Sequence, residues 1–122
     1  LRTYLLEEAY EAVDAIDSGD EDRIADELGD VLLQVVFHGK IAAEHGAFTD
    51  LDITTAICQK MIRRHAHIFG DVVCHNAAEV SASWEQLKKQ EKHLTSLSAA
   101  MRDVTPGLPA LMRAAKVQSK AK

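Results

Sequence analysis

Two pairs of carboxylates stand out because of their residue types and spacing. Glu8 and Glu11 are three residues apart, and so are Glu27 and Asp30. Residues three apart on a helix lie about 60° apart around its axis and share a face. Carboxylates gathered in this way repel one another unless a cation lies between them, and Mg²⁺ prefers such oxygen ligands. The pattern therefore predicts a metal-binding face.

An ordinary solvated acidic surface is the alternative interpretation, because exposed helix faces are often acidic. Two observations favour a metal site. Arg23, four residues before Glu27, is the one Lys or Arg a helical turn away from any of the four carboxylates. Both acid pairs also border apolar positions of their helices, so they are not confined to a solvent-facing side. The residues alone leave both interpretations open.

The elements that must position these acids are two helices. Apolar residues at helical spacing predict helices over residues 3–17 and 21–45, and Ser18-Gly19-Asp20 is typical of a stop, a turn and a new N-cap. So short a connection makes the two helices antiparallel neighbours. At a rise of about 1.5 Å per residue, Glu11 lies about 12 Å from the turn and Glu27 about 11 Å. The two acid pairs therefore meet at matching heights.

The same periodicity predicts three further helices: one that begins after Asp50 or Asp52 and reaches about residue 65, one over residues 78–94, and one from Pro109 to about residue 120. A turn is expected at Phe69-Gly70-Asp71. Residues 95–108 show no clear period and are expected to form a mobile connector. The predicted fold class is all-α: an antiparallel helical bundle of about four to five helices in a single domain, residues 1–122.

Composition narrows the class of protein. Hydrophobic residues make up 47% of the 122 residues but aromatics only 5%, which suits a core of packed aliphatic helices. The net charge of -5 argues against binding a nucleic-acid polymer, which requires a basic surface. No apolar run approaches the roughly 18 residues that span a membrane. Cys58 and Cys74 form no CxxC pair, which is typical of a reduced, cytoplasmic protein.

Around these acids and well beyond them, the sequence resembles the MazG-type pyrophosphohydrolases. That family carries E-E-x-x-E and, after a spacer, E-x-x-D, which here begin at Glu7 and Glu27. The resemblance extends over residues 5–11, 26–38, 60–69, 84–92 and 108–111. It therefore spans nearly the whole chain rather than one short motif.

The resemblance implies an Mg²⁺-dependent hydrolase, with Mn²⁺ as an alternative ion, that converts nucleoside triphosphates to monophosphate and pyrophosphate. It also implies a homodimer whose helices complete a joint bundle. The metal ligands that it implies are Glu8, Glu11, Glu27 and Asp30. The substrate-binding residues that it implies are Lys60, Arg64, Trp84 and Lys88.

Each of the other assigned residues also has a purely structural interpretation. Lys60 and Arg64 share a helix face and can hold phosphates, or they form an ordinary basic helix end. The Trp84 ring can stack on a base while Lys88, one turn on, reaches a phosphate; a tryptophan in the core or a dimer contact is the alternative. Glu7 is the candidate catalytic base for the attacking water, and a surface acid is an equally good interpretation.

The sequence also departs from the family pattern. Ala66 stands where the family usually has Pro, so the third helix is expected to run further than usual. A Cys-Pro-Trp-Asp stretch that precedes the first helix in the family is absent, and we expect the domain to be truncated at its N-terminus. Many relatives hold two such domains, so the alternative function is a catalytically weak regulatory or dimerisation module of a tandem protein. A ferritin-like di-iron protein is disfavoured, because that class carries Glu-x-x-His where this chain has Asp30.

Overall fold

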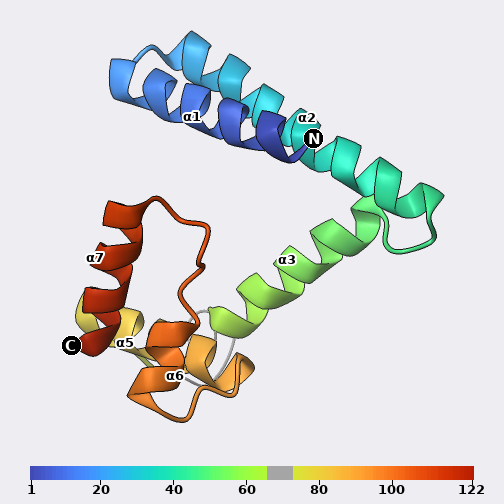
Figure 1. Ribbon diagram of the computed structural model, residues 1–122. Helices are drawn as coiled ribbons and strands as arrows, with labels where there is room; N and C mark the ends of the chain where they lie inside the picture. Colours follow the sequence, from blue (N-terminus) through green and yellow to red (C-terminus); the bar gives the residue numbers. More distant parts are fainter. Residues whose placement is uncertain (66–72) are drawn as a thin grey trace. The chain divides into compact units, whose positions relative to one another are not determined.

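The computed structural model describes residues 1–65 and 73–122, and all regular structure in these ranges is helical (Figure 1). The helices are α1 (Arg2–Ser18), α2 (Glu21–Glu44), α3 (Asp50–Arg64), α5 (Ala77–Glu91), α6 (Leu97–Arg102) and α7 (Ala110–Ala121). The predicted all-α class is confirmed. None of these helices has both the length and the apolar character that crossing a bilayer requires. The chain divides into two compact units, Leu1–Gln59 and Lys60–Lys122.

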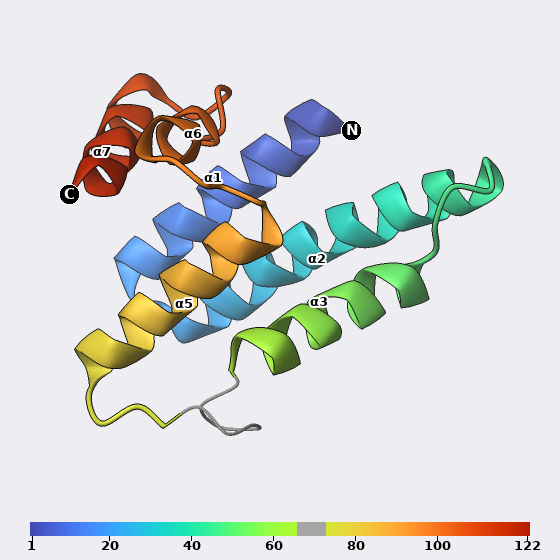
Figure 2. The same cartoon turned by 90° about the horizontal axis from the view of Figure 1, so that it is seen from below.

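The first unit is built on a hairpin of α1 and α2, which lie side by side in both ribbon views (Figure 1 and Figure 2). α1 ends at Gly19, whose backbone is left-handed with φ 73°. α2 begins at once, because the Asp20 side chain accepts a 3.2 Å hydrogen bond from the backbone N–H of Arg23. A left-handed residue followed by an N-cap reverses the chain within two residues. The predicted antiparallel pair is therefore confirmed.

Small side chains line the contact between α1 and α2. Ala12 and Ala15 are buried, Ala15 completely, and small residues let two helix axes approach closely. Larger apolar side chains of the same hairpin stay in solvent: Tyr10 is 60% exposed and Leu32 is 63% exposed. The first unit by itself thus leaves much of the apolar surface of the hairpin uncovered.

α3 follows α2 after a short turn. Gly46 is left-handed with φ 67°, and two residues then cap α3 reciprocally. The Asp52 carboxylate accepts a 2.8 Å hydrogen bond from the Thr49 N–H, and the Thr49 hydroxyl accepts one of 3.2 Å from the Asp52 N–H. α3 ends at Arg64, close to the predicted end. The predicted effect of Ala66 and the turn at Phe69-Gly70-Asp71 lie outside the described residues.

Gly39 of α2 is buried against the first turn of α3. A Cβ at this position would collide with Oδ1 of Asp50 and lie 3.4 Å from Cδ1 of Ile53. That Oδ1 is buried without a hydrogen-bond partner in the described part of the chain, whereas Oδ2 lies 3.5 Å from Nζ of Lys40. Gly39 therefore permits this close approach, because a larger residue would have to displace the Asp50 side chain.

The second unit contains α5, α6 and α7 together with the end of α3. α5 begins with a reciprocal cap: the Asn76 side chain accepts from the Glu79 N–H at 2.9 Å, and the Glu79 carboxylate accepts from the His75 N–H at 2.8 Å. α5 ends at Glu91, short of the predicted end at residue 94. The reason is His93, whose φ of 52° is incompatible with a continuing right-handed helix.

Residues 95–108, predicted to be a connector without regular structure, contain α6. Ser96 caps this helix, and its hydroxyl accepts a 3.1 Å hydrogen bond from the Ala99 N–H. Ala100 and Val104 are buried, and α6 packs against α7. A helix of six residues is too short to display an apolar period, which is why periodicity missed it. α7 begins directly after Pro109, close to the predicted start.

Candidate functional site

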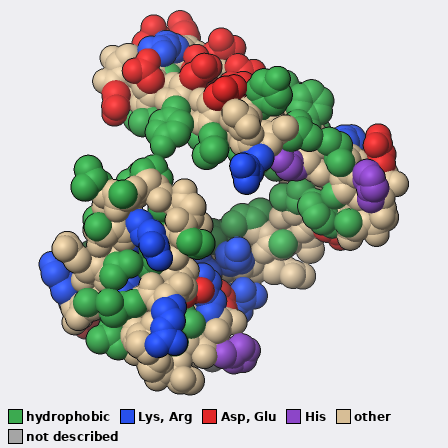
Figure 3. Space-filling model, viewed as in Figure 1, with side chains coloured by type: hydrophobic (Ala, Val, Ile, Leu, Met, Phe, Trp, Pro, Cys, Tyr) green, Lys and Arg blue, Asp and Glu red, His purple; other side chains and the backbone are tan. Residues whose placement is uncertain are grey.

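Three of the four predicted metal ligands come together on the α1–α2 hairpin. Glu8, Glu11 and Glu27 each offer one carboxylate oxygen, and these three oxygens lie within 4.8 Å of one another. Glu8 and Glu27 are half-buried and Glu11 is exposed. Figure 3 shows acidic side chains gathered over this hairpin, with hydrophobic ones beside them. We call Glu8, Glu11 and Glu27 the acidic cluster.

Asp30, the fourth predicted ligand, lies outside the acidic cluster as the structure has it. Its side chain is exposed on α2, one turn after Glu27. Its charge nevertheless helps to raise the pKa of Glu8, so it acts on the same group of carboxylates. The helical spacing therefore places Asp30 beside the cluster, and its role as a ligand stays a prediction.

Glu8 lies in surroundings that disfavour a charged carboxylate. Burial raises the pKa of its carboxyl above the ordinary value of 4.5, and repulsion from Glu11, Asp30, Glu27 and Glu7 raises it further. Both causes disfavour the charged carboxylate. A cation among these oxygens would turn the mutual repulsion into attraction, so the electrostatics of the cluster favour cation binding.

The donor set fits a hard divalent cation. It consists of carboxylates, and Mg²⁺ prefers oxygen ligands at about 2.1 Å, which puts two oxygens of one ion at most about 4.2 Å apart. The 4.8 Å limit on the three oxygens is slightly wider, and small side-chain rotations would close it. The group contains no histidine, which disfavours the di-iron alternative with its Glu-x-x-His pairs.

Arg23 is a functional candidate that sequence reasoning treated only as a local partner of Glu27. Its Nε lies 4.0 Å from Oε1 of Glu27, and its NH2 group donates a 2.6 Å hydrogen bond to Asp14. The hydrogen bond to Asp14 is the main cause that raises the pKa of the guanidinium. Arg23 is thus a fixed positive charge at the edge of the acidic cluster. Its position one turn before Glu27 was the feature of the sequence that could have indicated this role.

Glu7, the candidate base, is exposed on α1 next to Glu8. Its charge is the last of the causes that raise the pKa of Glu8, so it is the most weakly coupled of the acids involved. An exposed carboxylate at the edge of the cluster is free to accept a proton from water. The role of Glu7 as the catalytic base stays a prediction.

Arg64 and Trp84, two of the predicted substrate-binding residues, lie together in the second unit. The guanidinium carbon of Arg64 is 5.5 Å from the centroid of the Trp84 ring. The His65 ring meets the same indole edge-on, with 4.8 Å between centroids. Trp84 is therefore half-buried between a cation and an imidazole, an arrangement that fixes the plane of its ring.

Glu91 is a second residue that sequence reasoning missed. Its carboxylate accepts 2.6 Å hydrogen bonds from NH2 of Arg64 and from Nε of Arg63. These bonds are the main cause that lowers the pKa of Glu91 to about 2. The predicted substrate-binding Arg64 and its neighbour Arg63 are thus held by one carboxylate. Glu91 had no local sequence signal because it lies 27 residues from Arg64.

Lys88 also has a carboxylate partner. It pairs with Glu85, one turn earlier on α5, and Glu85 accepts a 2.6 Å hydrogen bond from Lys120 of α7 as well. Hydrogen bonds from Lys120 and then Lys88 are the largest causes that lower the pKa of Glu85 to about 2. Lys60 is half-buried and forms no ion pair with the residues that the structure describes. The structure therefore brings Arg64 and Trp84 into contact, and Lys60 takes no part in the interactions described for this pair.

Known proteins match this chain. The sequence model of the family described as the MazG nucleotide pyrophosphohydrolase domain matches residues 1–69. The chain is 48% identical over 118 residues to uncharacterized protein YabN of Bacillus subtilis, and 47% identical over 117 residues to the nucleoside triphosphate pyrophosphohydrolase of Escherichia coli (strain K12). It is 45% identical over 121 residues to the nucleoside triphosphate pyrophosphohydrolase/pyrophosphatase MazG of Thermotoga maritima. These matches cover 97%, 96% and 99% of this chain.

The chain spans less than half the length of each of these relatives. It covers 24% of the Bacillus protein, 44% of the Escherichia coli protein and 46% of the Thermotoga protein. The family match contains the acidic cluster, Asp30 and Arg64, whereas Trp84 and Lys88 lie beyond residue 69.

Proposed function

Because this chain belongs to the MazG nucleotide pyrophosphohydrolase domain family, we propose that it hydrolyses nucleoside triphosphates to nucleoside monophosphate and pyrophosphate. The observation that carries the proposal is the acidic cluster, three carboxylate oxygens within 4.8 Å of one another on two helices. The relatives named nucleoside triphosphate pyrophosphohydrolase support the same reaction. The protein would then be a hydrolase that acts on a phosphoanhydride bond.

Glu8, Glu11 and Glu27 would hold Mg²⁺, or Mn²⁺ in its place, with Asp30 on the same side of α2 as a further ligand. Such an ion would neutralise phosphate charge and lower the pKa of a water molecule. In the reaction, a water oxygen forms a bond to the α-phosphorus, the bond between the α- and β-phosphates breaks, and pyrophosphate leaves. Glu7 would accept the proton that the water loses.

The basic and aromatic residues of the second unit suit the phosphate chain and the base of the substrate. Arg64 and Lys88 would hold phosphate oxygens, and Trp84 would stack on the base. Each cation has a carboxylate partner, Glu91 or Glu85, which keeps its side chain extended and placed without a ligand. Lys60, without such a partner among the described residues, would add a positive charge. The net charge of -5 fits small phosphate substrates better than a nucleic-acid polymer.

We also propose that the protein is a homodimer. The support is the uncovered apolar surface of the first unit, where Leu28 is 49% exposed, Leu32 63% and Val13 53%. Exposed apolar surface of this kind marks an interface, and a second copy would complete the bundle that α1 and α2 begin. The two free cysteines, Cys58 and Cys74, fit a cytoplasmic protein.

The test of the function is pyrophosphate release from a panel of ribo- and deoxynucleoside triphosphates, with Mg²⁺ and with a chelator. We expect Mg²⁺-dependent release with the monophosphate as co-product, and loss of release in Glu8→Gln. Glu44→Gln, an exposed glutamate at the far end of α2, is the matched control and should retain activity. A well-folded dimer without any release would overturn the proposal in favour of a regulatory or dimerisation module.

A further inference from the structure

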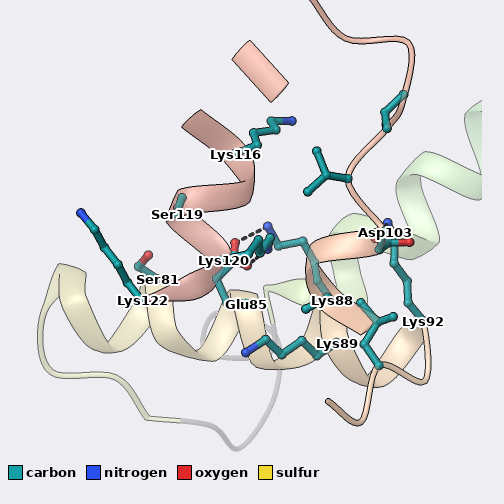
Figure 4. Close-up of a pocket in the computed structure, with 14 residues that line it drawn as sticks. Ser81, Glu85, Lys88, Lys89, Lys92, Asp103, Lys116, Ser119, Lys120 and Lys122 are labelled. Carbon is teal, nitrogen blue, oxygen red and sulfur yellow. Dashed lines mark hydrogen bonds and ion pairs between the residues drawn. The ribbon is translucent and has the colours of Figure 1, made fainter. Parts of the chain in front are cut away.

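The second unit contains a cavity of about 580 Å³ whose walls are rich in lysine (Figure 4). Its lining side chains come from α5, from the segment that follows α6, and from α7. Six lysines contribute: Lys88, Lys89, Lys92, Lys116, Lys120 and Lys122. The acidic lining residues are Glu85 and Asp103, so six positive charges face two negative ones and leave an excess of four.

The two carboxylates organise the cavity without neutralising it. Glu85 accepts a hydrogen bond from Lys120 at 2.6 Å and pairs with Lys88, and Figure 4 shows these ammonium groups meeting at Glu85. Asp103 accepts a 2.6 Å hydrogen bond from Lys92. The chain thereby fixes three lysines around the cavity by ion pairs, one of which joins α7 to α5. The excess charge calls for an anionic ligand.

Three further lysines, Lys89, Lys116 and Lys122, form no ion pair with the residues that the structure describes, and the first two of them lie within helices. Lys89 on α5 and Lys116 on α7 both line the cavity, and neither forms an ion pair with any residue that the structure describes. Like charges held around one cavity repel each other, so their arrangement is destabilising until an anion binds. These two lysines are therefore the residues that an anionic ligand would engage most directly.

The chemistry of the walls identifies the class of anion. Besides the ammonium groups, the cavity presents the hydroxyls of Ser81, Thr105 and Ser119. Ammonium and hydroxyl donors suit phosphate oxygens, and lysine binds phosphate as a point charge that needs no fixed geometry. Two or three linked phosphates carry roughly three to four negative charges, which matches the excess of four. The volume falls in the usual range for small-molecule sites.

We propose that this lysine cavity binds a polyphosphate chain of two or three phosphates without a metal ion. The site shares only Lys88 with the substrate-binding residues proposed above, and it includes none of the acidic cluster. It therefore stands independently of the proposed hydrolysis. Two sources carry this chemistry, free pyrophosphate and the triphosphate of a nucleotide.

The experiment is isothermal titration calorimetry on the whole chain with excess chelator, using inorganic pyrophosphate, inorganic tripolyphosphate and a nucleoside triphosphate in turn. Without a metal ion the acidic cluster repels these anions, and the cavity variants distinguish binding in the lysine cavity from binding at Arg64 and Lys60. The double variant K89Q/K116Q should weaken binding about tenfold or more, since each charge-assisted bond to phosphate is lost. K89R/K116R keeps the charge and should retain binding.

Arg113→Gln is the matched control, because Arg113 is an exposed cation on α7 that does not line the cavity. It should bind like the original protein, and circular dichroism should show unchanged helix content in all variants. Pyrophosphate binding as tight as that of tripolyphosphate would identify free pyrophosphate as a source. Binding of tripolyphosphate and the nucleotide alone would identify the triphosphate. The proposal is overturned by an absence of binding, by an equal loss in Arg113→Gln, or by a nucleotide that binds where tripolyphosphate does not.

Discussion

The guanidinium of Arg64 lies over the ring of Trp84, with its carbon 5.5 Å from the ring centroid. The same guanidinium donates a 2.6 Å hydrogen bond to Glu91. A cation over an aromatic ring is worth at least about 0.5–1 kcal/mol, and the carboxylate adds directional bonds. Arg64, which is proposed to hold phosphates, is therefore already positioned by Trp84, which is proposed to stack on the base. Substrate binding would then cost little further conformational entropy at the Arg64 side chain.

The lowered pKa of Glu91 makes the free energy of unfolding depend on pH in the acidic range. The carboxyl titrates at about 2 when folded and near its ordinary value of 4.5 when unfolded. Its contribution is therefore fully present above about pH 4.5 and is lost as the pH falls from 4.5 toward 2. In Glu91→Gln, urea unfolding followed across this range should show a flatter decline than in the original protein.

Glu85 titrates in the same window, so the Glu91→Gln variant should flatten the profile without abolishing its slope. Glu44→Gln, which removes an exposed glutamate on α2 that has no ion pair in the described part of the chain, serves as the control. Its profile should follow that of the original protein. An unchanged slope in Glu91→Gln would show that the pairs with Arg63 and Arg64 are absent in solution.

The close approach of Gly39 to Asp50 predicts a large effect of one methyl group. Gly39→Ala should lower the free energy of unfolding by about 1–3 kcal/mol, because the new Cβ collides with the buried Oδ1 of the partly exposed Asp50 side chain. Gly29→Ala on the same helix is the control, since nothing lies within 4 Å of its Cβ position. Alanine favours helix over glycine, so that variant should be stabilised by about 0.5–1 kcal/mol. Denaturant unfolding of both variants measures the difference.

Mg²⁺ should raise the melting temperature of the protein, because the proposed metal site exists in the folded chain and not in the unfolded one. At about 100 times its dissociation constant, a ligand stabilises the folded state by about 2.7 kcal/mol. Glu8→Gln should lose most of this shift, and the shift should also shrink as the pH falls, since the ligands must be ionised. Equal shifts in Glu8→Gln and in the original protein would place the metal elsewhere.

The exposed apolar surface of the hairpin predicts how the dimer can be broken. Leu32→Glu introduces a charge where Leu32 is 63% exposed on α2, and sedimentation should then show a monomer with retained helix content. Glu44→Lys changes a charge about 120° away around the same helix and should leave the dimer intact. A dimer in both variants would mean that the interface lies on another surface.

The parts of the fold that depend on local sequence were predictable. The periodicity of α1 and α2, the left-handed Gly19 and the capping Asp20 are local signals, and they suffice to bring Glu11 and Glu27 together. The all-α class follows from the same signals. Asp30 shows the limit of helix geometry, because the correct face and spacing did not bring its oxygen within the group formed by the other three acids.

The parts that depend on distant contacts were not predictable. Glu91 meets Arg64 across 27 residues of sequence, and Lys120 meets Glu85 across 35, so neither pair has a pattern that spacing can reveal. The lysine cavity is a consequence of such contacts between α5 and α7. The missed α6 has a different cause, since its stability comes from the buried Ala100 and Val104 rather than from a repeating pattern.

The two-residue turn at Gly19 and Asp20 also limits how the chain can change in length. Glu11 and Glu27 meet because each lies a set number of residues from that turn. One residue inserted between Glu11 and Gly19 would rotate Glu11 by about 100° and shift it by about 1.5 Å, which would move its carboxylate off the shared face. Residues on the outer faces of α1 and α2 can be replaced freely by comparison. We therefore expect natural selection to eliminate insertions and deletions between Glu8 and Asp30. Those beyond Glu44, where α2 has ended, can persist in related sequences.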